Sequence, residues 1–386
     1  MRRSSRGMRG GGINTSIYFY ISLTLQFSSM KKERKKIIQN YSVVDLFCGV
    51  GGLTQGFVKA KFEVCAGIDF DASCKYAYEK NNLTNFIHAD LTKYSPVEID
   101  KLYPTNSIKI LAGCAPCQAF STYQQGNKKN DKWKLLYSFG EIIKQIRPAI
   151  VSMENVPNLL KYNKGKVFED FISVLKTNNY FISYKIVDAK DYGVPQRRKR
   201  LILLASKFGE INLIGKTHTG KKIKNVLQAI GHLPKIKAGE AYYKDKLHRA
   251  RELSDLNLRR IRATSEGGSW KEWDDELILN CHKKESGKSY GSVYGRMNWY
   301  EVSPTLTTQC TGYGNGRFGH PEQDRAISLR EAAILQSFPK KYDFIEPNEG
   351  FTTSVIEKHI GNAVPPRLGY VIAKSIKEHL IKCHVN

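Results

Sequence analysis

Short apolar runs alternate with amphipathic stretches through the first half of the chain. Seven of these runs have the length and composition of buried strands, and turn residues or a polar residue follow most of them. They lie at residues 42–47, 62–68, 85–89, 108–112, 149–153, 181–187 and 201–205. Helical patterns separate several of them, notably at residues 52–60 and 167–176. This alternation predicts an α/β fold with a mostly parallel sheet and helices on both faces.

The alternation stops after residue 205. Residues 206–300 mix short apolar pieces with Gly, Lys and aromatic residues, and they carry 19 Lys and Arg against 11 Asp and Glu. We interpret this stretch as an irregular domain that faces an anionic partner, with an ordinary solvated surface as the alternative. Helical patterns return at residues 328–338, closed by Pro339, and at residues 367–380, where apolar residues form one stripe.

Charge and cysteine content narrow the class of protein. The 386 residues carry a formal net charge of +25, which favours nucleic acid as the partner ahead of an anionic membrane surface. The eight cysteines are scattered without a dense framework. Free thiols in a reducing compartment are therefore expected, and we place the protein in the cytoplasm.

Residues 1–40 differ from the rest of the chain. Residues 17–27 are apolar but too short to span a bilayer as a helix, and no cleavage site of the A-x-A kind follows them. Met30 opens a Lys-rich run just before the first predicted strand. We expect translation to start at Met30 and residues 1–29 to be an unstructured or mis-assigned extension.

A glycine-rich turn follows the first predicted strand. In Cys48-Gly-Val-Gly-Gly52 the glycines let a ligand approach backbone N–H groups closely. Asp69, at the end of the next strand, could accept hydrogen bonds from ribose hydroxyls. The pattern suits NAD, FAD or S-adenosylmethionine equally, so it predicts a nucleoside-containing cofactor without choosing among them.

A cysteine-containing turn follows the fourth predicted strand. It places Pro116-Cys117-Gln118 at the edge of the sheet where open α/β folds do their chemistry. Taken alone, Cys117 is most simply a small core residue. Cys114 and Cys117 could also form a thioredoxin-like dithiol, whereas the lack of a second C-x-x-C argues against a structural zinc site.

Seven sequence blocks, taken in order, resemble the DNA (cytosine-5) methyltransferases of bacterial restriction-modification systems. The blocks are VVDLFCGVGGL, GCAPCQAFS, MENV, VPQRRKR, SPTLTT, SLREAAILQSFP and HIGNAVPP. They cover most of residues 41–206 and 303–380. The resemblance implies a Rossmann-like sheet that uses S-adenosylmethionine, with a smaller irregular target-recognition domain inserted.

The resemblance also implies a covalent mechanism. Carbon-5 of cytosine is a poor nucleophile, so a thiolate first adds to carbon-6 and makes carbon-5 able to attack a sulfonium methyl group. Cys117 matches this thiolate, and Glu154 matches the acid that serves the ring at N3. Arg198 and Arg200 match the arginines that hold the active-site loop and the O2 edge of cytosine.

Further binding residues carry over from the same motifs. The residues that match the family's cofactor-binding positions are Phe47, Gly49, Gly51, Gly52, Asp69, Phe70, Asp90, Asn362 and Val364. The residues that match its substrate-facing positions are Pro116, Gln118, Ser121 and Thr305. No metal site is expected. The closing motif near Asn362 implies that the last helix packs back beside the first strand.

The resemblance divides the chain into four segments. They are the extension at 1–40, a catalytic and cofactor-binding domain at 41–205, a target-recognition domain and hinge at 206–351, and a C-terminal segment at 352–386 that completes the catalytic domain. The expected substrate is double-stranded DNA, with the target cytosine rotated out of the duplex. A cognate restriction endonuclease is the expected functional partner, and no membrane is involved.

Three other functions would each fit part of the sequence. An RNA cytosine methyltransferase would share the chemistry, but the long basic insertion favours a reader of duplex DNA. A nicotinamide-dependent oxidoreductase would give Cys117 and Glu154 no joint purpose. A non-catalytic DNA-binding module would be expected to lose at least one of Cys117, Glu154, Arg198 and Arg200.

Overall fold

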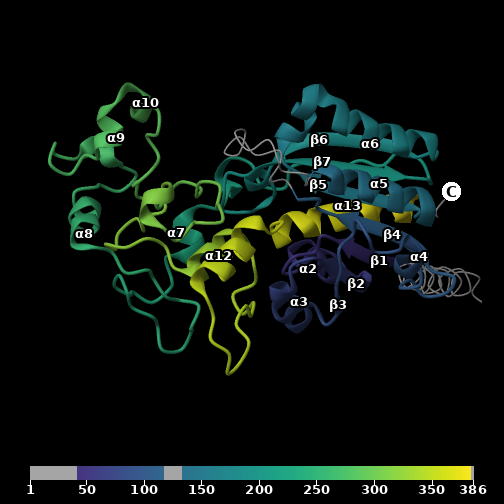
Figure 1. Cartoon of the computed structure of the whole chain (residues 1–386), viewed down its shortest axis with the longest axis horizontal. Helices are drawn as coiled ribbons and strands as arrows, with labels where there is room; N and C mark the ends of the chain where they lie inside the picture. The colour runs from purple at the N-terminus through teal and green to yellow at the C-terminus, as the bar shows by residue number, and fades with distance from the viewer. Residues whose placement is uncertain (1–40, 117–132, 384–386) are drawn as a thin grey trace, which may run out of the picture.

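The computed structural model describes residues 41–116 and 133–383. A seven-stranded sheet, in the order β3-β2-β1-β4-β5-β7-β6, forms the centre of the larger part of the molecule (Figure 1). The strands are β1 (Tyr41–Leu46), β2 (Glu63–Asp69), β3 (Asn85–His88), β4 (Ile108–Gly113), β5 (Ile150–Asn155), β6 (Phe181–Asp188) and β7 (Lys199–Ser206). Only β7 runs antiparallel to its neighbours, β5 and β6. The predicted α/β fold with a mostly parallel sheet is confirmed.

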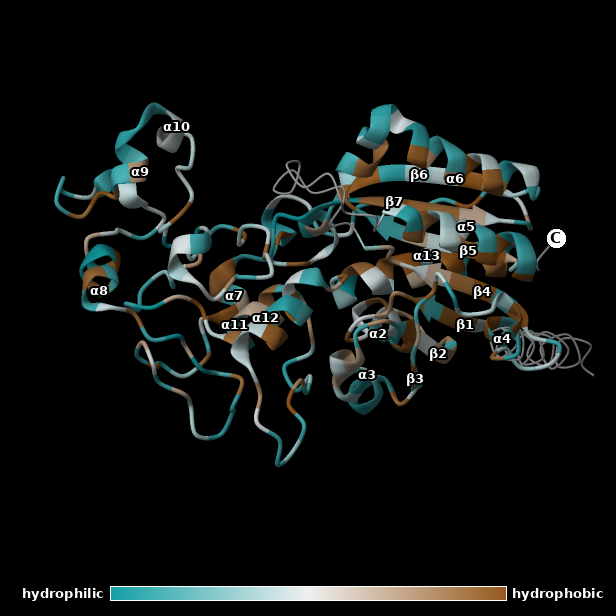
Figure 2. Ribbon diagram, viewed as in Figure 1, coloured by the Kyte–Doolittle hydropathy of each residue, from teal (hydrophilic) through white to brown (hydrophobic). Residues whose placement is uncertain are grey.

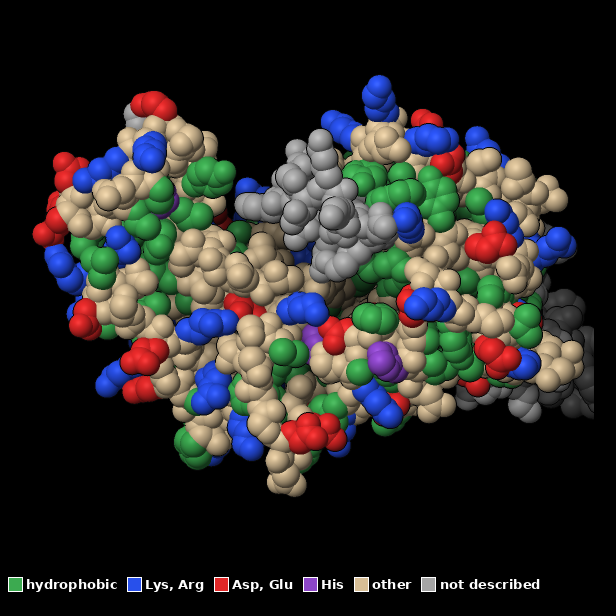
Figure 3. All heavy atoms as spheres, in the orientation of Figure 1, with side chains coloured by type: hydrophobic (Ala, Val, Ile, Leu, Met, Phe, Trp, Pro, Cys, Tyr) green, Lys and Arg blue, Asp and Glu red, His purple; other side chains and the backbone are tan. Residues whose placement is uncertain are grey.

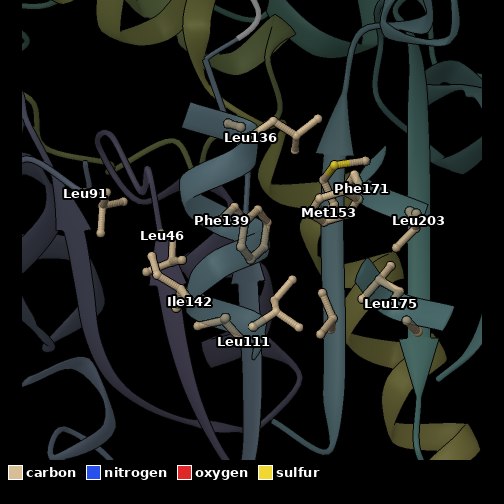
Figure 4. Packing of buried hydrophobic residues seen from close by; sticks show 14 of the residues in the cluster. Leu46, Leu91, Leu111, Leu136, Phe139, Ile142, Met153, Phe171, Leu175 and Leu203 are labelled. Carbon is tan, nitrogen blue, oxygen red and sulfur yellow. The ribbon is translucent and has the colours of Figure 1, made fainter. Parts of the chain in front are cut away.

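Helices cover both faces of this sheet. They are α2 (Gly52–Lys59), α3 (Lys75–Asn82), α4 (Pro96–Asp100), α5 (Lys134–Ile146), α6 (Lys166–Thr177) and α13 (Pro366–Cys383). One core lies between the sheet and α5 and α6 (Figure 4), and a second lies between the sheet and α2 and α13. In β1, Val44 and Leu46 join the first core and Tyr41 and Val43 the second. This two-residue alternation is that of a strand buried on both faces.

The C-terminal helix α13 packs against α2, which follows the first strand. Two glycines meet at this contact, and a Cβ atom on Gly56 would lie 2.2 Å from the backbone carbonyl carbon of Gly369. The two helices can therefore approach closely only because both positions lack a side chain. No helix of the described residues is long and apolar enough to cross a membrane.

We expect Gly56→Ala to lower the free energy of unfolding by about 1–3 kcal/mol, because the added methyl group would overlap the backbone of α13. Helix propensity alone would raise the free energy of unfolding by about 1 kcal/mol. A net loss of stability would therefore indicate the overlap with α13. Urea denaturation followed by circular dichroism measures the change. Gly215→Ala is the control, since nothing lies within 4 Å of a Cβ atom there. Equal effects of the two substitutions would show that the close helix contact does not limit stability.

The smaller part of the molecule is mostly irregular, as expected from the loss of alternation after residue 205. Its short helices are α7 (Val226–Ile230), α8 (Asp255–Arg262), α9 (Asn280–Lys283), α10 (Glu285–Lys288) and α11 (Leu329–Leu335), and α12 (Thr353–Asn362) leads back to α13. Apolar residues of α11 belong to a buried cluster, whereas α9 and α10 are mostly polar (Figure 2). A helix over 328–338 was predicted, but α11 ends at Leu335. Ser337 has a φ of 70°, in the left-handed region, so the helix cannot continue through it.

Candidate functional site

A cavity of about 830 Å³ opens at the carboxyl edge of the sheet. Its walls come from the ends of β1, β2, β3 and β4 and from the junction of α12 and α13. The strand order reverses between β1 and β4, and ligands of open α/β sheets bind at such a switch point. The predicted cofactor residues that line the cavity are Phe47, Gly49, Asp69, Phe70, Asp90, Asn362 and Val364, and the predicted substrate residue Pro116 lies there too.

The Asp69 carboxylate accepts a hydrogen bond from the backbone of the glycine turn. The backbone N–H of Gly49 donates to Oδ2 of Asp69 at 2.8 Å, and the N–H of Asp71 donates to Oδ1 at 2.9 Å. Burial raises the pKa of the Asp69 carboxyl group, although these hydrogen bonds act in the opposite direction. Phe47 and Gly49 both have φ values in the left-handed region, at 57° and 50°. The turn therefore bends sharply and presents its backbone to the cavity.

Gly51 and Gly52 do not line the cavity but permit close packing behind it. A Cβ atom on Gly52 would lie 2.2 Å from the carbonyl oxygen of Val364. A Cβ atom on Gly51 would lie 2.3 Å from Nδ2 of Asn82. These two predicted residues thus bring the C-terminal segment and α3 against the glycine turn.

Phe70 and Asp90 lie at the outer rim of the cavity. The Phe70 side chain is 71% exposed, so its ring is open to a planar ligand. The ring of His88 lies with its centroid 6.1 Å from that of Phe70. Asp90 accepts hydrogen bonds from the backbone N–H and the hydroxyl of Thr92, at 3.0 and 2.7 Å, and these lower its pKa.

A second carboxylate, not singled out from the sequence, lies beneath the turn. Asp45 is 1% exposed, and the hydroxyl of Thr54 donates to its Oδ2 at 2.7 Å. Its Oδ1 has no hydrogen-bond partner among the described residues. Burial raises the pKa of Asp45 to about 7. In the sequence, Asp45 stands out as an acidic residue within an otherwise apolar predicted strand, and this pattern could have identified it.

A polar cluster at the start of α3 joins the cavity to α12. Lys358 forms an ion pair with Oδ2 of Asp71 at 2.7 Å, and Nε2 of His359 lies 2.9 Å from the Ser73 hydroxyl. Asp71, Cys74 and His359 also offer ligand atoms within 4.8 Å of one another. Since Lys358 and Ser73 already bond both oxygens of Asp71, we interpret the cluster as a structural tie. Burial lowers the pKa of His359 to about 4, so its ring is neutral at pH 7.

Glu154 lies near the end of β5 with only 2% of its surface exposed. Nε of Arg200 is 3.0 Å from its Oε1, and the Cys114 thiol donates to its Oε2 at 3.0 Å. Antiparallel pairing sets Ile202 of β7 opposite Glu154, so Arg200 reaches the carboxylate diagonally on the same face. Two of the predicted catalytic residues, Glu154 and Arg200, are thus in contact, and Cys114 contacts Glu154 as well.

Arg198 has a different place from Arg200. It is 2% exposed and donates to the carbonyl oxygens of Leu306 at 3.1 Å and Gly361 at 2.9 Å. These bonds fix the residue before β7 both to the chain near Leu306 and, through Gly361, to the C-terminal segment. Nearby, the Thr305 hydroxyl donates to the carbonyl oxygen of Arg197 at 2.6 Å.

Cys117, Gln118 and Ser121 lie outside the described residues. The segment that leads to them is anchored at the site. The Asn155 side chain donates to the carbonyl oxygen of Ala115 at 3.2 Å, and Pro116 lines the cavity. Asn155 follows Glu154 directly and was not given a role from the sequence.

The strand order and the switch-point cavity define a Rossmann-like α/β fold. A solved structure of a DNA modification methyltransferase from an Escherichia coli prophage has this fold, with 21% identity and a TM-score of 0.67 over 89% of this chain and 99% of that chain.

Sequence comparison identifies the family. Residues 41–378 match the family model described as C-5 cytosine-specific DNA methylase. The Type II methylase M.HgiDII of Herpetosiphon aurantiacus is 53% identical over 343 residues, which are 89% of this chain and 97% of that protein. The Type II methyltransferase M1.HphI of Haemophilus parahaemolyticus is 27% identical, covering 94% of each. The chain belongs to the C-5 cytosine-specific DNA methylase family, as the seven motifs predicted.

Proposed function

We propose that this protein transfers a methyl group from S-adenosylmethionine to carbon-5 of a flipped-out cytosine in a specific double-stranded DNA sequence, through a covalent adduct of Cys117 at carbon-6. The main support is the contact of Glu154 with Arg200 and Cys114 beside the switch-point cavity. Cys114 links Glu154 to the cavity, because its thiol contacts Glu154 and the residue also lines the cavity. A ligand in the cavity would therefore lie next to the acid.

The cavity suits S-adenosylmethionine in size and in chemistry. Its volume of about 830 Å³ lies within the range of ligand sites, roughly 300–1,000 Å³. Phe70 would stack on the adenine, Asp90 would accept from its amino group, and Asp69 would bond the ribose. Asn362 and Val364 would close the other end. When bound, this cofactor supplies a methyl group on a positively charged sulfur.

The chain's own residues then account for the chemistry at the base. The Cys117 thiolate adds to carbon-6, and negative charge develops at N3 and O2 of the ring. Glu154 holds a proton at N3 and so stabilises that charge. Arg200 orients Glu154, while Arg198 keeps the C-terminal segment against the site.

DNA would lie between the sheet and the smaller part. Lys and Arg side chains are spread over the visible face of both parts (Figure 3), and phosphate binding by such residues makes affinity fall as salt rises. We assign residues 41–205 to catalysis and cofactor binding, residues 206–351 to target recognition and the hinge, and residues 352–386 to completion of the catalytic domain. Because similar proteins are Type II methylases, a restriction endonuclease is the proposed functional partner.

Conversion sequencing of a plasmid grown with the expressed protein tests this function. The expected result is 5-methylcytosine at one short sequence, absent from plasmid grown with an empty vector. Sequencing cellular RNA in the same way tests the RNA alternative. Methylation confined to RNA, or no methylated cytosine in either nucleic acid, would contradict the proposal.

A further inference from the structure

The residue directly after β4 contacts the proposed acid. The Cys114 thiol donates to Oε2 of Glu154 at 3.0 Å, while Arg200 pairs with Oε1. As far as the described residues show, these are the titratable and charged groups in contact with this carboxylate, one after β4 and one on β7. The two oxygens of Glu154 are therefore held from two different strands.

The sheet register explains why Cys114 reaches Glu154. Gly113 pairs with Met153 in the parallel β4–β5 ladder, so the next residue on each strand continues side by side. The backbone N–H of Cys114 donates to the carbonyl oxygen of Leu46, which prolongs the β4–β1 pairing by one residue. The backbone of Cys114 is thus held by a hydrogen bond to β1. The position of the backbone directs the thiol toward Glu154.

We propose that Cys114 is a positioning residue for Glu154, whose carboxyl group its thiol holds in place for methyl transfer. This inference rests on the function proposed above. The thiol and Arg200 together restrict the carboxyl group to one orientation beside the cavity. Because a thiol is a weak donor, its effect is expected to be modest.

Infrared difference spectroscopy tests the contact without requiring activity. Subtracting the spectrum of Cys114→Ser from that of the wild type isolates the S–H stretching band of Cys114 from those of the other seven cysteines. In the Glu154→Gln background this band is expected to move to higher frequency, because an amide oxygen is a weaker acceptor than a carboxylate. An unchanged band would show that the thiol does not bond Glu154 and would overturn the inference, while leaving the proposed function intact.

The rate of single-turnover methyl transfer tests the role. Cys114→Ala and Cys114→Val remove the donor, and valine also fills the space. Both are expected to slow transfer roughly 3- to 10-fold, because the carboxyl group loses one of the two contacts that orient it. Cys114→Ser keeps a donor and is expected to retain the wild-type rate.

Cys65→Ala is the matched control, since Cys65 is a partly buried thiol on β2 outside the cavity lining. Cofactor binding and thermal melting confirm that each variant is folded. A wild-type rate in both Cys114→Ala and Cys114→Val would overturn the inference, and so would a loss in Cys114→Ser as large as in Cys114→Ala. A wild-type protein that transfers no methyl group to any DNA would instead overturn the proposed function, and this inference with it.

Discussion

Glu154→Gln is expected to lower the rate of methyl transfer by roughly 10²–10⁴, the usual range for loss of an acid–base group. Glutamine has nearly the same shape, so it can occupy the same place between Arg200 and Cys114. It has no acidic proton to hold at N3 of cytosine. The loss should therefore fall on the chemical step, measured as the single-turnover rate with saturating DNA and cofactor.

Binding should survive this substitution. Glu154 does not line the cavity, so we expect cofactor affinity to change by less than about 3-fold. Glu141→Gln is the control, because Glu141 is an exposed glutamate on α5 bonded only to Lys144 and Gln145 among the described residues. A wild-type rate in Glu154→Gln would remove this residue from its proposed role. A parallel fall in melting temperature and cofactor affinity would indicate a structural role instead.

Much of the sheet could be predicted from the chain because its central strands, such as β1 and β5, are buried on both faces and appear as continuous apolar runs. The edge strand β6 is partly exposed but is also rich in apolar residues, and all seven strands were found within a few residues of their observed bounds. The position of β7 between β5 and β6 could not be predicted in this way. Periodicity shows which faces of a strand are buried, but it does not show which strands pair with each other. β7 pairs antiparallel with β5, although β6 lies between these two strands in the sequence.

In the site, too, the sequence identified the residues, whereas their contacts depend on how the strands pair. The two arginines of the Q-x-R-x-R pattern were assigned together, yet only Arg200 lies on β7, where diagonal pairing brings it to Glu154. Arg198 precedes the strand, so its side chain is free of the strand's alternation and turns to backbone carbonyls. Cys114 was considered only as half of a C-x-x-C pair, because its contact with Glu154 depends on the β4–β5 register.

Cys117→Ser is expected to abolish methyl transfer, with a loss of roughly 10⁴-fold or more, as found when a covalent nucleophile is removed. A serine hydroxyl keeps its proton at neutral pH, whereas a thiol can supply the thiolate that adds to carbon-6. The substitution changes one atom, so DNA affinity should remain within about 3-fold of the wild type. Filter binding with a duplex that carries the mapped recognition sequence measures that affinity.

The covalent step itself can be trapped. In a duplex with 5-fluorocytosine at the target position, methyl transfer leaves fluorine on carbon-5, where the reaction normally removes a proton. Since fluorine does not leave as a cation, the bond from sulfur to carbon-6 persists and the complex should resist denaturing electrophoresis. The wild type and Cys65→Ser are expected to form this complex, and Cys117→Ser is not. A denaturation-resistant complex in Cys117→Ser would assign the nucleophile to another residue. A wild-type protein that methylates cytosine but forms no such complex with the 5-fluorocytosine duplex would exclude covalent addition.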